Sequence, residues 1–394
     1  MTERTKQGAY YTGEYRNLFA EAGYSEEEIE AKLNAHFQTL FYGSEEERIY
    51  HPVGEDLGYM EDTGNHDART EGMSYGMMFC VQMDKREEFD RIWNWSKKYM
   101  YMDHGESAGY FAWSCQVTGE KNAHGAAPDG EEFYAMALIF AANRWKEPSY
   151  LEKARKLLHT MIHKGENGSA GAPMVNPENF LYLFVPGCEF TDPSYHVPHF
   201  YELFAEYGPE EDREIWKKAA AASRTYLQKA CHFVTGLSAE YSEYDGSPKI
   251  LSEKQIRRFG SRHDWFFSDA YRTVPNISLD LAWYGPWEKN AENGQTQQEI
   301  AEKYQRFFEE TVPECPLGIY EIDGTVIQKE EAKHSVGLFA SRAQASLASE
   351  GPYAMETVKK LFEMPLKTGK YRYYDNCLFF FAFLALSGHY RIWK

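Results

Sequence analysis

The sequence predicts an all-α fold in which helices pair into an inner and an outer ring, an α/α barrel. Apolar residues recur with the i, i+3, i+4, i+7 spacing of helices in about twelve segments. Some segments, such as 134–142 and 378–386, are apolar on nearly every face, whereas 151–163 is amphipathic. Because an all-round apolar helix is buried and an amphipathic one faces solvent, the alternation predicts concentric rings.

The individual helices follow from this spacing in chain order. A buried helix is expected after Arg69, and the later ones are expected near 89–96, 131–145, 151–163, 215–230, 300–308 and 377–386. Long polar loops rich in Gly, Asp and aromatic residues separate them, at 103–127, 165–194 and 241–264. Loops of this length in a compact chain are usually functional, and their aromatic residues argue against disorder.

Charge and composition exclude several kinds of ligand. The formal net charge of −18 argues against nucleic acid, anionic membranes and polyanionic substrates, since clustered Lys and Arg bind these. Aromatic residues make up 16% of the chain, and such rings either fill a core or stack on flat ligand faces like those of carbohydrates. A neutral ligand fits best, and no protein partner is implied.

The N-terminal segment and the cysteines predict a compartment. Residues 1–7 are polar and lack the apolar region of a secretory signal, and no run of about 18 apolar residues could span a membrane. The six cysteines are scattered without a C-x-x-C pair, as is typical of reduced core residues. We therefore expect a cytoplasmic protein.

The most informative segment is Arg69–Met78, in which a single carboxylate, Glu71, precedes a run of small and apolar residues. Apolar surroundings would make Glu71 hold its proton tightly, as a general acid requires; a helix-terminal Glu stabilised by the helix dipole is the alternative. Gly72 and Gly76 indicate that something approaches the backbone closely. The segment also matches the G-x-S-x-G nucleophile elbow, but residues 66–70 do not resemble the preceding strand which that motif needs.

Two further carboxylates stand where a loop meets an inner-type helix. Asp129 follows Pro128 and has helix capping as its alternative role. Asp269 lies one turn before Arg272, a cation that favours the charged form a general base needs; capping is again the alternative. Because the starts of inner helices meet at one rim, the three carboxylates could converge on one cleft and divide acid and base roles.

At these residues the chain resembles the inverting glycoside hydrolases of family 8. The T-E-G-M-S-Y-G stretch is similar to that family's general-acid motif, with Glu71 as the acid, and F-F-S-D-A-Y-R to its base motif, with Asp269 as the base. The P-D-G-E-E stretch resembles the site of a third aspartate, here Asp129, which holds the sugar at the cleavage subsite. The resemblance covers most of the chain. It implies a single catalytic domain over residues 1–394, a six-hairpin (α/α)6 barrel whose long loops form a substrate cleft at one rim.

Segments 192–204 and 372–376 resemble most strongly the intracellular branch that releases xylose from the reducing end of xylo-oligosaccharides. This implies hydrolysis of β-1,4-xylo-oligosaccharides with inversion of the anomeric centre. The acid would protonate the leaving oxygen and the base would deprotonate a water, with the two carboxyls roughly 6.5–9.5 Å apart. One departure is Lys333-His334-Ser335-Val336, where Leu-His-Pro is expected.

The resemblance and the loop composition also suggest residues that bind substrate. Tyr201 resembles a tyrosine that helps hold the water, with a core aromatic as the alternative. Trp113 could stack on a sugar face or pack in the core. Tyr374, Arg272 and His334 are the remaining candidates.

No metal or cofactor is expected, and two other functions stay open. His196 and His199 form an H-x-x-H around Pro198, which lacks the nearby acidic ligands of a zinc site, and no phosphate-binding loop is present. One alternative is an endo-acting family 8 glycosidase on β-1,4-glucan or chitosan oligosaccharides. The other is a sugar-binding protein whose carboxylates are catalytically inactive.

Overall fold

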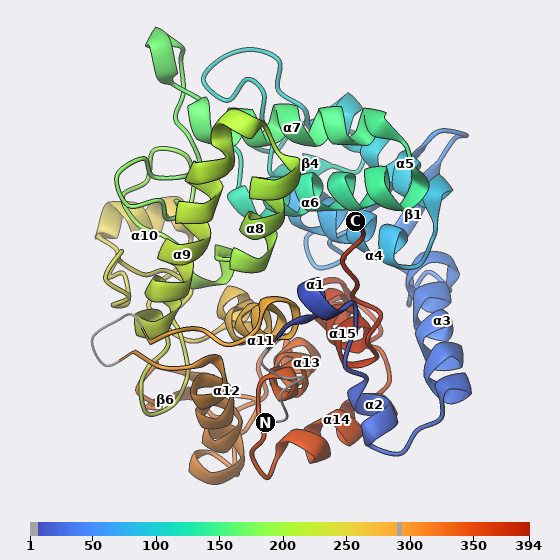
Figure 1. The fold of residues 1–394 in the computed structure, drawn as a ribbon, viewed down its shortest axis with the longest axis vertical. Coiled ribbons are helices and arrows are strands. Elements are labelled where there is room, and N and C mark those ends of the chain that lie inside the picture. The colour runs from blue at the N-terminus through green and yellow to red at the C-terminus, as the bar shows by residue number, and fades with distance from the viewer. Residues whose placement is uncertain (1–6, 290–293) are drawn as a thin grey trace.

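Six helices that are apolar on nearly every face form the centre of the molecule (Figure 1). The computed structural model describes residues 7–289 and 294–394. Each inner helix contacts the next and the last contacts the first, which closes the ring. The inner helices are α4 (Thr70–Gln82), α6 (Pro128–Trp145), α8 (Pro198–Tyr207), α11 (Thr273–Tyr284), α13 (Ser335–Gln344) and α15 (Arg372–Leu386).

Six outer helices surround this ring, and each packs on one inner helix. Figure 1 shows α7, α9, α12, α14 and α3 at the periphery. The last pair joins the two ends of the sequence, because α3 packs on α15. In the order of their inner partners the outer helices are α5 (Arg86–Trp95), α7 (Pro148–His163), α9 (Arg213–Ala230), α12 (Gln297–Arg306), α14 (Ala354–Glu363) and α3 (Glu26–Tyr42). The predicted (α/α)6 barrel is confirmed.

The burial pattern follows the two helix types that the sequence distinguishes. Every residue of α15 is buried, and in α4 the only residue that is not buried is Glu71. Among the described residues, three short α-helices lie outside the two rings: α1 (Ala9–Thr12), α2 (Leu18–Glu21) and α10 (Glu253–Phe259). Within the same residues, none of the helices combines the length and apolar character needed to cross a bilayer. The polar residues 1–6 lie outside the described part of the chain.

Three antiparallel two-stranded sheets lie in the loops, and one of them contradicts the expectation that no strand precedes Glu71. They pair β1 (Tyr50–Val53) with β2 (Leu57–Met60), β3 (Asp67–Arg69) with β4 (Ser114–Gln116), and β5 (Ile319–Tyr320) with β6 (Val326–Gln328). We expected no strand before Glu71, but β3 ends directly before α4. The nucleophile-elbow motif still fails, because Ser74 lies inside α4 and its hydroxyl donates to the carbonyl oxygen of Glu71 at 2.9 Å.

Candidate active site

The starts of the inner helices gather chemically active side chains at one rim. Each helix contributes at or just before its first turn, where unpaired backbone N–H groups and the helix dipole favour negative charge. This arrangement brings together residues that are far apart in the sequence, such as Glu71 and Tyr373, which are 302 positions apart. In helix order they are Glu71, Asp129, Tyr195, Asp269 with Arg272, His334, and Tyr373 with Tyr374.

Glu71 is held by two donors from different inner helices. Arg272 Nη1 donates to Oε2 at 2.8 Å, and the Tyr373 hydroxyl donates to Oε1 at 2.8 Å. Gly72 makes room for this second contact, because a Cβ there would lie 2.5 Å from the Tyr373 hydroxyl oxygen. Gly76 serves packing instead, since its Cβ would lie 2.7 Å from Met60 Sδ. Both glycines therefore allow the close approach that the sequence indicated.

Burial gives Glu71 the proton affinity that its apolar context predicted. Loss of hydration raises the pKa of Glu71 to about 7; the charge of Arg272 opposes this rise, and the charges of Asp129 and Asp269 add to it. A carboxyl group with such a pKa is about half protonated at neutral pH, which suits a general acid.

Asp129 is the second residue of α6, directly after Pro128, and therefore lies in the first turn, as the capping alternative predicts. Its Oδ1 accepts from the backbone N–H of Gly130 at 2.9 Å, while Oδ2 accepts from Arg272 at 3.1 Å. Burial raises the pKa of Asp129, against the opposing charge of Arg272. Its carboxylate therefore both supports the first turn of α6 and faces the arginine at the centre of the site.

Asp269 lies in a short 3₁₀ turn, Ser268–Arg272, that leads into α11. Its carboxylate makes no cap hydrogen bond in this described turn, so the capping alternative lacks support. Ser268 has a φ of 40°, a left-handed conformation that is uncommon for serine and must be held by its surroundings. The Tyr374 hydroxyl donates to the Ser268 carbonyl oxygen at 2.9 Å. Tyr374 thus holds the peptide bond between Ser268 and Asp269 and thereby orients Asp269.

Glu240, which the sequence analysis did not single out, supports the same turn from behind. Its Oε2 accepts from Trp265 Nε1 at 2.6 Å and contacts His263 Nδ1 at 3.0 Å, while Oε1 accepts from the backbone N–H of Asp269 at 3.4 Å. Burial raises the pKa of Glu240 to about 7. No sequence motif marks Glu240, because it lies in a polar loop and contacts Asp269 only in the folded structure.

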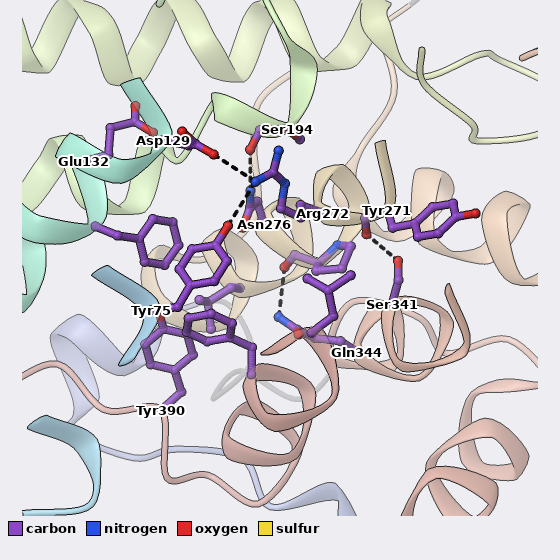
Figure 2. A pocket seen from close by; sticks show the side chains of 15 residues that line it. Tyr75, Asp129, Glu132, Ser194, Tyr271, Arg272, Asn276, Ser341, Gln344 and Tyr390 are labelled. Carbon is purple, nitrogen blue, oxygen red and sulfur yellow. Dashed lines mark hydrogen bonds and ion pairs between the residues drawn. The ribbon is translucent and has the colours of Figure 1, made fainter. Parts of the chain in front are cut away.

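Arg272 lies at the centre of the site and contacts all three carboxylates. Besides Glu71 and Asp129, it approaches Asp269 Oδ1 with Nη2 at 3.4 Å, and its Nη1 donates to the Tyr75 hydroxyl at 3.0 Å. Figure 2 shows the guanidinium between Asp129 and Tyr75. The cavity beneath it, inside the barrel, has about 30 Å³, room for a water but not a sugar. Arg272 does not line the two larger cavities, although it contacts the carboxylates that do.

Two cavities meet at Glu71 and Asp269, which line both of them. The larger has about 560 Å³ and is also lined by Trp113, whose side of the cleft is open enough to leave this residue 40% exposed. The smaller has about 200 Å³ and is also lined by His334 and Tyr374. An exposed indole at a cavity wall is a platform for a sugar face, so the packing alternative for Trp113 lacks support.

Tyr201 does not reach either cavity, which corrects the expectation that it faces the cleft. Its side chain is fully buried in α8, and its hydroxyl donates to Glu132 Oε1 at 2.7 Å. The tyrosine that lines the larger cavity is Tyr195, in the turn before α8, and the Arg272 guanidinium lies 5.5 Å from its ring centre. Both tyrosines lie in segment 192–204. Tyr195 belongs to the turn before α8 and faces the cavity, whereas Tyr201 belongs to α8 itself and is buried.

Asp192, which also lies in segment 192–204, is a second residue that the sequence analysis did not single out. It caps the turn Pro193–Tyr195 by accepting from the backbone N–H of Ser194 at 2.7 Å. Its other oxygen is buried without a hydrogen-bond partner in the described structure. Burial and the charge of Asp269 raise the pKa of Asp192 well above its usual range. Burial therefore favours the protonated, uncharged form of Asp192 beside Asp269.

The loop that departs from the expected Leu-His-Pro sequence forms one wall of the smaller cavity. His334 precedes α13 and its Nδ1 lies 2.9 Å from Asp375 Oδ2. The Lys333 ammonium lies 4.5 Å from the centre of the Tyr371 ring, a cation–π contact at the same cavity.

The two histidines of the H-x-x-H pair, His196 and His199, are fully buried, and burial lowers the pKa of each to about 3.

The comparisons with known proteins agree with this geometry. The model of glycosyl hydrolases family 8 matches residues 56–387. The reducing end xylose-releasing exo-oligoxylanase of Halalkalibacterium halodurans is 53% identical, with 99% of this chain and 97% of that protein covered. The corresponding enzyme Rex8A of Paenibacillus barcinonensis is 51% identical, with 99% of each covered.

Solved structures and more distant relatives place the chain within this group. The structure of Rex8A complexed with xylose superposes with a TM-score of 0.92 at 50% identity, covering 98% of this chain and all of that one. Endoglucanase 2 of Ruminiclostridium josui is 24% identical, over 83% of this chain and 65% of that protein. The chain is therefore a member of glycosyl hydrolases family 8.

Proposed function

We propose that the protein hydrolyses β-1,4-xylo-oligosaccharides, releases xylose from the reducing end, and inverts the anomeric centre. The observation that supports this best is the pair Glu71 and Asp269, which lies at the junction of a larger and a smaller cavity and shares Arg272. The 51–53% identity to enzymes named for this activity points to the same reaction.

In this proposal Glu71 is the general acid and protonates the glycosidic oxygen, which its pKa of about 7 supports. Asp269 is the general base and takes a proton from the attacking water; its side chain is 31% exposed, so water reaches it. Asp129, which lines the larger cavity, holds the sugar at the point of cleavage, and Arg272 positions the three carboxylates. Tyr195, rather than Tyr201, is the tyrosine that orients the water beside Asp269.

The unequal cavities suggest how the enzyme acts on chain ends. We assign the smaller cavity, lined by His334 and Tyr374, to the single xylose that leaves from the reducing end. The larger cavity then binds the remainder of the chain, with Trp113 stacking on a sugar face. This cavity, of about 200 Å³ and lined by Lys333, suits a single xylose better than a continuing polymer, which argues against the endo-acting alternative.

Xylotriose carrying ¹³C at its reducing-end C1 provides the test. NMR is expected to find the label in free xylose, and the new reducing end of the xylobiose is expected to appear first as the α-anomer. Labelled xylobiose, or an initial β-anomer, would contradict the end specificity or the inverting mechanism. Cellotriose and chitotriose serve as controls, because faster turnover of either would favour the endo-acting alternative. Binding without any turnover would favour a sugar-binding protein.

The phenylalanine variant of Tyr373 is expected to shift the pH dependence. The hydrogen bond from Tyr373 stabilises the Glu71 carboxylate and thereby lowers its pKa. Because the acid works protonated, activity is lost as pH rises through this pKa. Tyr373→Phe should therefore move the basic limb of kcat/KM to higher pH by about one unit. Tyr374→Phe is the control, since its hydroxyl contacts Ser268; an unmoved limb in Tyr373→Phe would contradict the assignment of the limb to Glu71.

We also propose a cytoplasmic location, in which the enzyme would trim short oligosaccharides. The cysteines support this, since all six are free and four are buried, as in reducing compartments. Fractionation of the source cells tests it, and recovery of the protein from the medium would count against it.

A further inference from the structure

Two histidines and a buried aspartate converge on the outer surface of the barrel, between α7 and the start of α9. His159 and His163 lie one turn apart on α7, and their ring centres are 4.3 Å apart. Asp212 ends the short turn Glu210–Asp212 that leads into α9. Their ligand atoms all lie within 4.8 Å of one another. None of the three lines a cavity of the candidate active site.

The hydrogen bonds within this cluster leave one buried carboxylate oxygen of Asp212 without a partner. Asp212 Oδ1 lies 2.6 Å from His163 Nε2, a good hydrogen bond. Asp212 Oδ2 lies 3.4 Å from His159 Nδ1 and, although the Asp212 side chain is only 1% exposed, has no hydrogen-bond partner in the described structure. A buried carboxylate oxygen without a partner is costly, so this atom calls for an additional positive group.

The outer face of the cluster has the support that metal-binding histidines use. The second ring nitrogen of His163, Nδ1, lies 2.9 Å from Glu166 Oε1. This contact is an ion pair and not a hydrogen bond in the described structure, and a carboxylate on the far side of an imidazole favours presentation of the other nitrogen to a metal. His159 is half exposed, with 52% of its side chain accessible, so a fourth position at the metal would open to water. The set thus has the three protein ligands and one open position of an exposed zinc site.

We propose that His159, His163 and Asp212 bind one divalent transition-metal ion, of which Zn²⁺ is the best match. Two imidazoles with one carboxylate favour Zn²⁺ or Co²⁺ over Ca²⁺ and Mg²⁺, which prefer oxygen ligands. Metal–ligand bonds of about 2.0–2.1 Å place tetrahedral ligand atoms about 3.3 Å apart. Asp212 Oδ2 and His159 Nδ1 already have nearly this separation, whereas His163 Nε2, which lies 2.6 Å from Asp212 Oδ1, would have to move outward.

The ion would connect two outer helices that otherwise belong to different helix pairs. α7 packs on α6, whereas α9 packs on α8. A metal bridge between α7 and the turn before α9 would therefore stabilise the folded state, which alone holds the ligands together. Because the cluster is remote from the cleft, we expect metal binding to raise the melting temperature and to leave kcat unchanged.

The test uses the full-length protein after chelator treatment and dialysis. Calorimetric titration with Zn²⁺ is expected to show one site per chain, and Co²⁺ is expected to give the visible absorption of tetrahedral coordination, whereas Ca²⁺ should do neither. His159→Gln should weaken Zn²⁺ binding by more than about tenfold, since even loss of an outer-shell partner costs roughly 10–100-fold. It should also abolish the Zn²⁺-dependent rise in melting temperature.

The control is His389→Gln, which removes a histidine paired with one carboxylate, Glu30, at 2.7 Å. It should bind Zn²⁺ like the unaltered protein. Glu166→Gln gives a second variant that is exposed enough to fold, and it should weaken binding without abolishing it. Equal Zn²⁺ affinity in His159→Gln and the unaltered protein, or no binding beyond that of Ca²⁺, would overturn the proposal and leave the cluster as a pair of ion-paired histidines.

Discussion

Replacing Glu71 with Gln is expected to lower kcat on xylotriose by about 10²–10⁴-fold, the usual contribution of general acid catalysis. Glutamine fills the same volume, and its amide oxygen can still accept from Arg272 while its amide nitrogen donates to the Tyr373 hydroxyl oxygen, but it has no acidic proton to give to the leaving oxygen. Binding of xylotriose should stay measurable by calorimetry. The loss should appear in kcat rather than in KM, because the proton is transferred only in the transition state.

A substrate that needs no acid separates this role from misfolding. An aryl β-xylobioside with a strongly acidic phenol as leaving group departs without protonation, so Glu71→Gln should cleave it at a rate close to that of the unaltered enzyme. Glu189→Gln, an exposed residue outside both cavities, is the matched control on xylotriose. A Glu71→Gln variant that keeps more than about a tenth of the original rate on xylotriose would exclude Glu71 as the acid.

Replacing Asp269 with Asn is expected to reduce hydrolysis by a similar factor, about 10²–10⁴-fold, through the opposite proton transfer. Asparagine keeps the volume but cannot accept a proton from water. The melting temperature should change little, because the carboxylate makes no cap hydrogen bond in its described turn. Loss of a helix cap would instead lower stability by about 1 kcal/mol and leave turnover intact.

Asp269→Ala with added azide distinguishes a base from a structural residue. The smaller side chain leaves space on the water side of the cleft, and azide needs no base to attack the anomeric carbon. The variant should regain turnover with azide and form an α-glycosyl azide while the leaving oxygen takes its proton from Glu71. The unaltered enzyme should form none. A β-glycosyl azide would place the attack on the other face and reject Asp269 as the inverting base.

Helical periodicity predicted the barrel well because each inner helix records its burial in its own sequence. The run from Gly72 to Gln82 and the last helix, α15, are largely apolar and are buried on every face. The small sheets were missed for the opposite reason. Strand β3 has three residues, and its partner β4 lies 47 positions away, so no local pattern marks the pairing.

The candidate site was predictable only where a side chain and its motif share one helix start. Glu71, Asp129 and Asp269 stand at such starts, and all three contact Arg272. Tyr201 lies only six positions after Tyr195, yet it points into the core because α8 turns it away from the rim. Glu240 contacts Asp269, and Tyr373 contacts Glu71, through tertiary contacts that no sequence spacing encodes.

The single guanidinium shared by three carboxylates also bears on inhibitor design. Even with one proton on Glu71, the charges around Arg272 leave an excess of negative potential in the cleft. The oxocarbenium-like transition state carries positive charge on its ring, so this potential stabilises it more than the neutral substrate. Iminosugars shaped like xylose carry a protonated ring nitrogen at neutral pH and imitate that charge. The cleft should therefore select such cations over xylose itself, and most strongly below the pH at which their nitrogen loses its proton.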